Sequence, residues 1–250
     1  YKRIIIDYSL SMLYNTVKRG GLMFFFFLKN PYVAVIGDIK GSRMLKDRHA
    51  VQMKFQDVLS EINEKYSEDI YSKFTITIGD EFQGLLYGGK NLMSIISEIE
   101  IAMYPVSFRF GIGVGSISTE VNRDIAIGAD GPGYYNARTA IDLLKKNEHR
   151  KQAGVSNIRI ELADDNQTSQ SLLNTVFSLM TSIKESWSSK QRQTIYDALL
   201  HQDNQSDTAR RLGITQPTVQ RHLSGGHYYT YKEALDTVQN ILDEIGDNNV

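Results

Sequence analysis

The chain has 250 residues, of which 41% are hydrophobic, and this is enough apolar material for one large folded domain or two smaller ones. It contains no cysteine, which excludes disulfides, thiolate zinc sites and cysteine nucleophiles. Its formal net charge is −1, so no chain-wide basic field favours nucleic acid or a membrane surface, and any DNA contact must come from a local patch.

Residues 1–22 show no clear alternation of apolar and polar residues, and we interpret residues 1–30 as an extension of doubtful order. Met23 begins the sequence that leads into the first strand, so we expect the natural start there. A secretory signal is the competing interpretation, because Lys18 and Arg19 precede the apolar run at 22–28. That run is followed by no small-residue cleavage site and is too short to span a membrane. We therefore expect a cytoplasmic protein that makes no membrane contact.

The first strand is predicted at 32–38, where a nearly continuous apolar run ends in Asp38. A tight loop follows at 39–43. Apolar residues then recur at spacings of three and four, which predicts a helix at about 44–65. We expect Ser42 to cap this helix, whose N-terminal backbone N–H groups favour a phosphate.

A hairpin is predicted at 74–87, because apolar residues alternate with threonines as far as a turn. Gly79 and Asp80 suit that turn, since glycine accepts positive φ and aspartate bonds nearby backbone. Asp80 and Glu81 therefore lie at the tip of a rigid scaffold. The simpler interpretation of this pair is an ordinary solvated turn.

A second helix is predicted at about 90–103, and a strand follows at 106–115. Glycines alternate with apolar residues in that strand, which indicates close approach of another backbone or a ligand. A helix at about 134–147 and a strand at 157–162 complete the pattern. The order βαββαβ, then a helix and a strand, predicts an α+β sandwich of ferredoxin-like kind, with the sheet on one side and helices on the other.

In such a sheet the first strand lies beside the hairpin, so Asp38 and Asp80 are expected to converge at one edge. Carboxylate oxygens suit Mg²⁺ or Mn²⁺, and two such ions activate an attacking oxygen and stabilise a leaving pyrophosphate. Simpler alternatives exist for each part: a strand-end cap for Asp38, a helix start for Ser42, and a surface ion pair for Arg109. Taken together, the spacing favours a nucleotide–metal site.

Four blocks of sequence, in order, resemble the SatD family of bacteria: 36–43, 76–86, 109–115 and 130–138. The same blocks are more distantly similar to class III nucleotidyl cyclases and diguanylate cyclases. The resemblance implies a nucleotidyl-cyclase-type sandwich at 31–165 with a nucleotide ligand or substrate. If it is an enzyme, it resembles a metal-dependent nucleotidyl cyclase, a lyase that releases pyrophosphate from a nucleoside triphosphate.

The resemblance also implies roles for individual residues. The metal ligands it implies are Asp38, the Ile39 carbonyl, Asp80 and Glu81, which with Phe82 completes a Gly-Asp-Glu-Phe string. The nucleotide-binding residues it implies are Lys40, Gly41, Ser42, Arg43 and Gly79. The catalytic residues it implies are Asn136, Arg138 and Arg109.

Two departures from the cyclase pattern bear on activity. Ile76 stands where cyclases have a base-selecting lysine, four residues before the hairpin aspartate. Cyclases also place an asparagine and an arginine four residues apart on the later helix, but Ala140 stands four residues after Asn136. Arg138 is two residues along, which points it about 200° away on a helix. Base choice and turnover stay open, and a nucleotide-binding domain without turnover is the alternative.

The polar stretch at 163–169 is the expected domain boundary, and 166–250 is expected to be a small all-α domain. Helices predicted at 189–200, 205–212 and 215–223 resemble the helix-turn-helix of bacterial regulators. Gly213 makes the turn, and Thr215 and Pro217 suit the start of the third helix. The outward-facing residues expected to contact double-stranded DNA are Gln216, Thr218, Gln220 and Arg221.

The local charge of this module favours DNA binding only weakly. Residues 187–226 carry five Lys or Arg and three Asp, a balance of +2 that is weak for binding phosphates. A homodimer would double it. The last helix, at 231–245, either pairs subunits together with a helix at 170–187 or packs on the helix-turn-helix. The sequence favours a regulator whose nucleotide–metal domain controls a DNA-binding module; the alternatives are an active cyclase and a protein-interaction module without enzymatic activity.

Overall fold

The computed structural model describes residues 24–25, 31–77, 79–126, 128, 130–148, 156–162 and 166–246. The expectations about residues 1–23, including the start at Met23, lie outside this part of the chain. Among the described residues, no helix is both long enough and apolar enough to cross a lipid bilayer.

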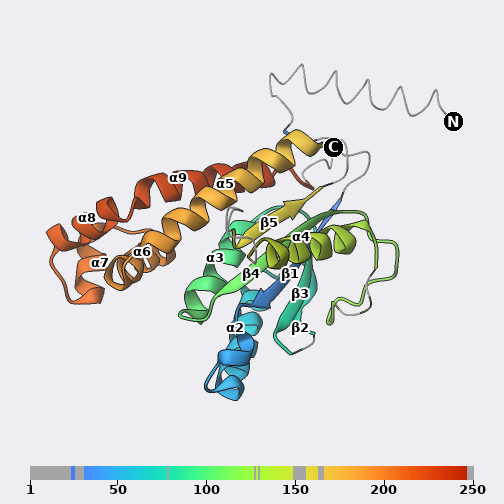
Figure 1. Cartoon of the computed structure of the whole chain (residues 1–250), viewed down its shortest axis with the longest axis horizontal. Coiled ribbons are helices and arrows are strands. Elements are labelled where there is room, and N and C mark those ends of the chain that lie inside the picture. The colour runs from blue at the N-terminus through green and yellow to red at the C-terminus, as the bar shows by residue number, and fades with distance from the viewer. Residues whose placement is uncertain are drawn as a thin grey trace.

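The chain folds as one mixed sheet followed by a run of helices (Figure 1). The first part contains β1 (Tyr32–Ile39), a 3₁₀ turn (Ser42–Met44), α2 (Arg48–Lys65), β2 (Ile70–Ile76), β3 (Glu81–Leu86), α3 (Leu92–Met103), β4 (Phe108–Gly115), α4 (Pro132–Glu148) and β5 (Ile158–Glu161). The second part contains α5 (Gln167–Ser186), α6 (Ser189–His201), α7 (Gln205–Leu212), α8 (Gln216–Gly225) and α9 (Tyr228–Leu242).

The sheet has the strand order β2-β3-β1-β4-β5. The central strand β1 is antiparallel to both β3 and β4, and β5 is parallel to β4 at the edge. The first four strands therefore have the order of a ferredoxin-like βαββαβ sandwich, and the predicted α+β class is confirmed.

Helices cover both faces of the sheet, so the prediction that they lie on one side was wrong. Val33 and Val35 of β1 face the core that includes α2 and α3. Ala34 and Ile36 face α4, where Ile141 belongs to the same cluster. A strand that is buried on both faces typically has a continuous run of apolar residues, and the sequence of β1 has this pattern.

Glycines in β4 allow α4 to approach the sheet closely. A Cβ atom on Gly113 would lie 2.1 Å from the backbone N of Ala137 and 2.1 Å from the carbonyl O of Gly133. On Gly111 it would lie 2.5 Å from the carbonyl O of Ala137. The predicted close backbone approach is therefore confirmed, and the neighbouring backbone is that of α4.

Helix α2 begins later than the sequence predicted. Asp47 is its N-cap residue and accepts a hydrogen bond from Ala50 N at 2.9 Å. Ser42 instead begins a short 3₁₀ turn, and Leu45 after it is extended. The prediction that Ser42 caps this helix was wrong, because the chain straightens at Leu45 before the helix begins and Asp47 takes the capping role.

The helical part packs back onto the sheet part (Figure 1). Helix α9 contacts α3, α5 and α8. The side chain of Gln239 on α9 accepts from Met93 N at 2.7 Å and donates to the Gly89 carbonyl at 3.0 Å. One cluster of buried apolar residues spans both parts of the chain and includes Val33 of β1 and Leu242 of α9. The apolar stripe of α9 is thus used within the chain, as one of the two interpretations expected.

Candidate functional site

Charged residues gather at one end of the sheet, beneath α4. Glu81, Asp38 and Arg109 stand opposite one another on β3, β1 and β4. Helix α4 and the residue after β1 add further charges that contact these three. We call the following set the charged row: Lys40, Asp38, Glu81, Arg109, Arg138, Lys145 and Glu148.

Every carboxylate of the charged row is paired with a cation. Arg109 bridges Asp38 and Glu148, one nitrogen to each. Lys145 lies 3.2 Å from the other oxygen of Asp38, and Lys40 lies 2.7 Å from Glu148. The row therefore already satisfies the oxygens that an external cation would need.

Burial and ion pairing act together on the pKa values of this row. Burial favours loss of the proton from Arg109, but hydrogen bonds and charges from Glu148 and Asp38 outweigh it, and the pKa of Arg109 rises above its usual range. Burial likewise favours protonation of Glu148, and hydrogen bonds from Arg109 and Lys40 outweigh it. The pKa of Glu148 is therefore lowered, and both groups are held in their charged forms.

The four predicted metal ligands lie around this row. Asp80 is in the hairpin turn, where its carbonyl accepts a hydrogen bond from Ile39 N at 3.1 Å. Arg138 donates to both oxygens of Glu81, at 2.6 and 2.7 Å. With Asp38 and Glu81 engaged in this way, the residues as they lie do not fit a divalent cation. Within the described ranges, no group of three or more acidic or histidine side chains is arranged to hold one. The metal stays a prediction.

The predicted catalytic residues serve different neighbours. Asn136 donates to the Val114 carbonyl at 2.9 Å and so ties α4 to β4. Arg138 points the other way, to Glu81 at the end of the hairpin. The two side chains therefore diverge, as their spacing of two residues predicts, and Arg109 is held within the row.

The predicted nucleotide-binding residues are dispersed around the β1 loop. Lys40 joins the charged row and also donates to Asn157 at 2.5 Å. Gly41 has a φ of 62°, Ser42 is buried and Arg43 is exposed. Gly79 sits in the hairpin turn with a φ of 67°. The prediction that these residues lead directly into the N-terminus of α2 was wrong, because that helix begins farther along, at Arg48. The contacts to a nucleotide stay a prediction.

Sequence reasoning missed Lys145 and Glu148, which complete the row from α4. A signal was present, because residues seven and three apart share a helix face, and Arg138, Lys145 and Glu148 have this spacing. The signal is weak by itself, since a charged helix face is usually solvated. The glycines of β4 brought this face against the sheet.

The end of the molecule farthest from the sheet carries α6, α7 and α8 (Figure 1). Gly213 ends α7 with a φ of 64°, and α8 follows after Thr215. Thr215 is the N-cap by position, but its hydroxyl bonds the Thr218 hydroxyl at 2.9 Å. Val219 and Leu223 of α8 are buried. The three predicted helices are confirmed, and a tight turn joins the last two.

The outward face of α8 presents the residues singled out from the sequence. Gln216, Gln220 and Arg221 are exposed, and Thr218 is half-buried. Gln205 of α7 bonds the amides of both Gln216 and Gln220 and fixes them in a row. Arg221 bonds Thr218 at 3.2 Å, and within the described part of the chain it pairs with no carboxylate.

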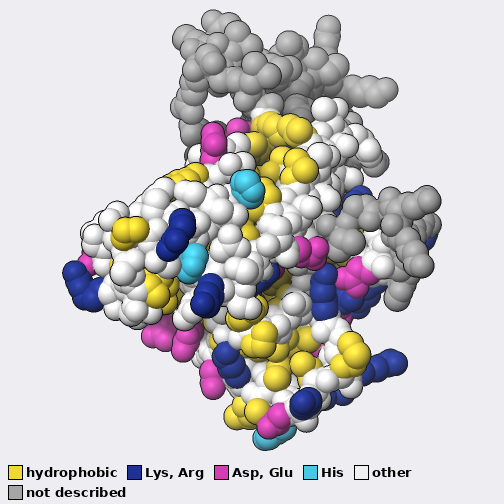
Figure 2. Space-filling model, turned by 60° about the vertical axis from the view of Figure 1, so that its left-hand side comes forward, with side chains coloured by type: hydrophobic (Ala, Val, Ile, Leu, Met, Phe, Trp, Pro, Cys, Tyr) yellow, Lys and Arg dark blue, Asp and Glu magenta, His cyan; other side chains and the backbone are white. Residues whose placement is uncertain are grey.

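The arginines of α7 are less available. Arg210 pairs with Asp207 at 2.7 Å, and Arg211 pairs with Asp197 and Asp203. The basic side chains on the face shown in Figure 2 are spread over separate places and do not gather into one patch. The electrostatic signal for nucleic acid therefore remains as weak as the sequence indicated.

The family model for the SatD family matches residues 32–235. The chain belongs to the SatD family. No curated protein matches this SatD-family chain.

Solved structures resemble it at low similarity. One is a bacterial light-regulated adenylyl cyclase, with 11% identity and a TM-score of 0.39 over 56% of this chain and 79% of that one. Another is the dimeric guanylyl cyclase domain of the RhoGC fusion protein from the aquatic fungus Blastocladiella emersonii, with 12% identity and a TM-score of 0.31 over 45% of this chain and 73% of that one. The regulator of polyketide synthase expression from Bifidobacterium adolescentis has 12% identity and a TM-score of 0.25, over 87% of this chain and 80% of that one.

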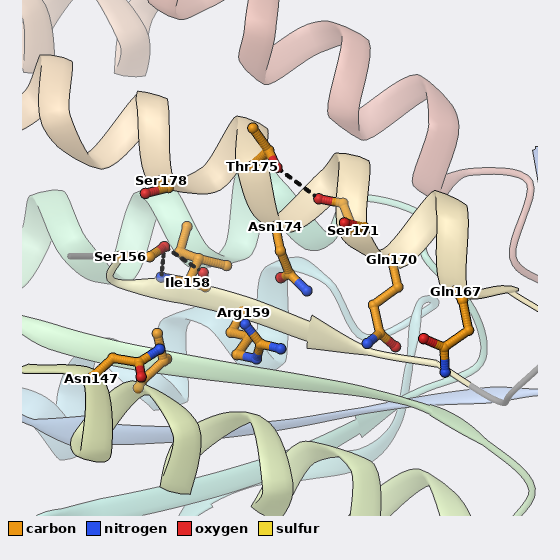
Figure 3. Close-up of a pocket in the computed structure, with 11 residues that line it drawn as sticks. Asn147, Ser156, Ile158, Arg159, Gln167, Gln170, Ser171, Asn174, Thr175 and Ser178 are labelled. Carbon is orange, nitrogen blue, oxygen red and sulfur yellow. Dashed lines mark hydrogen bonds between the residues drawn. The ribbon is translucent and has the colours of Figure 1, made fainter. Parts of the chain in front are cut away.

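A cavity of about 460 Å³ lies between α4, β5 and α5 (Figure 3). Asn174 and Gln170 point from α5 toward β5. The Asn174 amide bonds both the N–H and the carbonyl of Ile160, and Gln170 accepts from Leu162 N at 2.7 Å. These side chains occupy the outer edge of the sheet, so β5 is closed to a further strand.

Proposed function

We propose that this SatD-family chain is a DNA-binding regulator, in which α8 contacts a DNA duplex and the sheet part senses a nucleotide. The observation that carries the proposal is the outward face of α8. It combines two fixed amides with Arg221, whose charge meets no carboxylate in the described residues. Such a face follows a tight turn, as in the recognition helix of a helix-turn-helix.

The chemistry of this face suits a base edge. A glutamine amide both donates and accepts, and it pairs with the N6 and N7 atoms of adenine in the major groove. Gln216 lies in the first turn of α8, which is the part of a recognition helix that reaches the bases. Arg221, farther along, supplies a cation for a phosphate or a guanine.

Because the local charge is weak, we propose that two copies act together. A homodimer doubles the number of phosphate contacts and places two α8 helices on half-sites about 34 Å apart, one turn of the duplex. Helix α9 packs against helices of its own chain, so the surface that would join two copies has to be located by experiment. Sedimentation with and without a duplex measures this part of the proposal.

Equilibrium binding to a fluorescent duplex of random sequence, over a series of KCl concentrations, tests the proposal. We expect a complex at low salt that weakens steeply as salt rises, because each phosphate contact releases counterions. Arg221→Ala should reduce the slope of log K against log salt by about one for each site.

Lys54→Ala is the matched control, since Lys54 is an exposed cation on α2, away from α8. It should bind DNA as the wild type does. A chain that forms no salt-sensitive complex, or one in which both variants lose the same affinity, contradicts the proposal. The helical part would then be better explained as a protein-interaction module.

An active nucleotidyl cyclase is the second candidate function. The observation that favours it is the meeting of Asp38 and Glu81 on neighbouring strands, with Arg138 reaching Glu81 from α4. The test is incubation with each nucleoside triphosphate and Mn²⁺, followed by mass spectrometry. A product formed by the wild type and absent with Asp38→Ala and Asp80→Ala supports turnover, and no product from any triphosphate removes this candidate.

Bound Mg²⁺ or Mn²⁺ remains part of the enzyme candidate alone. The carboxylates must exchange their ion pairs before a metal binds, so the affinity expected for the wild type is low. Arg138→Ala frees both oxygens of Glu81 and should strengthen Mn²⁺ binding measured by electron paramagnetic resonance. Equal and tight binding to both proteins would contradict the description of the row as self-neutralised.

A further inference from the structure

A second cavity, of about 370 Å³, lies where the sheet meets the junction of α5 and α6. Its walls come from the end of α3, the start of β4, the loop after β1 and the first turns of α6. The lining residues used below are Lys40, Tyr104, Ser107, Lys184, Trp187 and Arg192. Its volume falls in the range of small-molecule sites.

Arg192 places a guanidinium in this cavity, whose lining also includes Glu100 and Glu185. Its guanidinium lies 5.4 to 5.7 Å from the ring centroids of Tyr104, Trp187 and Tyr196. It donates to the Tyr196 hydroxyl at 3.1 Å and to the Lys184 carbonyl at 2.5 Å. No carboxylate pairs with it among the residues described. Five N–H donors are available to an arginine, so this group keeps donors for an anion.

The other two cations of the cavity differ from Arg192. Lys184 is buried and pairs with both oxygens of Glu100, at 2.6 and 2.7 Å. Lys40 contacts Glu148 and Asn157 and so belongs to the charged row. The charge of Lys184 is thus neutralised by Glu100. Lys40 is paired within the charged row and also lines the cavity.

Aromatic rings supply the second half of a binding site. Tyr104 is 44% exposed at the rim, and Trp187 lies deeper, 5% exposed. A planar ring has a face to stack on at Tyr104, and an anionic group has the guanidinium of Arg192 beside it. We infer that this cavity binds a 5′-mononucleotide, with its phosphate on Arg192 and its base on Tyr104.

The cavity is joined directly to the DNA-binding helix of the proposed function. The Trp187 indole N–H donates to the carbonyl of Gly226, at the end of α8, at 2.6 Å. Thr194 of α6 bonds His222 of α8 at 2.8 Å. A ligand that repositions Arg192 and Trp187 therefore acts on α8, and this regulatory part of the inference rests on the proposed function.

The fluorescence of Trp187 reports on the cavity, because the chain has one tryptophan. Titration with adenosine 5′-monophosphate should change its emission in a saturable way. Adenosine and inorganic phosphate, each carrying half of the ligand chemistry, should bind at least tenfold more weakly.

Two variants test the location of the site. Arg192→Gln removes the charge, and Ser107→Tyr fills the cavity from an exposed position that leaves the aromatic wall intact. Both should lose saturable binding of adenosine 5′-monophosphate. Ser60→Tyr is the matched control, since Ser60 is exposed on α2 and does not line the cavity; it should bind as the wild type does.

The outcomes separate this inference from the proposed function. No saturable change with adenosine 5′-monophosphate, or one that persists in Ser107→Tyr, overturns the site even if the chain binds DNA. Loss of DNA binding in Arg221→Ala with unchanged nucleotide binding supports both. A chain that binds the nucleotide and never binds DNA keeps the site and overturns the DNA-binding function.

Discussion

The charged row at the end of the sheet and the outward face of α8 use polar residues in opposite ways. In the row, Asp38, Glu81 and Glu148 are each paired with cations of the same chain. On α8, the amides of Gln216 and Gln220 are fixed by Gln205, and Arg221 meets no carboxylate in the described residues. The row is richer in charge, yet each of its three carboxylates is paired, whereas the exposed face of α8 keeps a cation, Arg221, that no carboxylate of the described residues neutralises.

The difference shows why a dense cluster of charges is not in itself a binding site. The two groups of a buried ion pair have lost their hydration, and their attraction for each other offsets that cost. Removing either group leaves the other buried and unpaired, so both are needed for the stability of the fold. An exposed amide or guanidinium that faces water exchanges one partner for another at little cost. Variants in the row should therefore change stability, and variants on α8 should change binding.

The largest effect is expected for Arg109→Met. It leaves Asp38 and Glu148 without their shared cation, and the side chains of Arg109 and Asp38 are only 12% and 8% exposed. Removing one partner of a buried pair costs about 3–5 kcal/mol. Urea denaturation followed by circular dichroism measures the loss in the free energy of unfolding.

Arg159→Met is the control, because Arg159 pairs with Glu161 in a more exposed position, with the arginine side chain 26% exposed. It should cost about 1 kcal/mol or less. Equal losses for the two variants would contradict the view that burial commits the row to the fold.

Gly113→Ala is expected to have the next largest effect. The added methyl group meets the backbone of α4 at 2.1 Å, so the helix must shift away from the sheet. Overpacking of this kind costs about 1–3 kcal/mol. Thermal unfolding measures it, with Gly225→Ala as the control, because the added methyl group there meets only the movable end of Gln191 at 3.1 Å. A neutral Gly113→Ala would show that α4 does not need this contact.

Arg138→Ala should cost less than about 1 kcal/mol of stability. Its bidentate pair with Glu81 is well formed, but the arginine side chain is 45% exposed and water replaces much of the interaction. The same denaturation measurement applies. A loss as large as that of Arg109→Met would place Glu81 among the buried, committed groups.

The smallest effect is expected from pH. The pKa of Glu148 lies below its ordinary value of 4.5, so the stabilisation it contributes is present above about pH 4.5 and is lost as pH falls through the lowered pKa. The unfolding free energy should therefore decline in acid, and less so in Arg109→Met. An acid decline that is steeper in the variant would assign it to other groups.

Local patterns in the sequence carried most of the fold. The strands were located by alternation of apolar and polar residues, and the helices by apolar spacings of three and four. Gly213 indicated the turn between two helices, and the glycines of the strand at 106–115 indicated that another backbone approaches closely. The face that α4 covers was missed, because no local pattern states which side of a sheet a helix takes. The start of α2 was missed because Ser42 and Asp47 are both good caps, and only the extended Leu45 decides between them.

The candidate site was less predictable than the fold. Asp38 and Glu81 were recognised, but their neutralisation depends on Lys145 and Glu148, which are distant in sequence. The arginine cavity gave no sequence signal at all, since Tyr104 and Arg192 come from separate elements. Contacts of this kind follow from tertiary packing, which spacing along the chain does not encode.

The most direct test of the central claim, that α8 contacts DNA, is selection from a pool of random-sequence duplexes. The wild type and Gln216→Ala are each used to recover bound duplexes, which are amplified and sequenced. We predict that the wild type enriches one motif and that Gln216→Ala tolerates other bases at one position of it. No enrichment by the wild type above the starting pool would contradict the account.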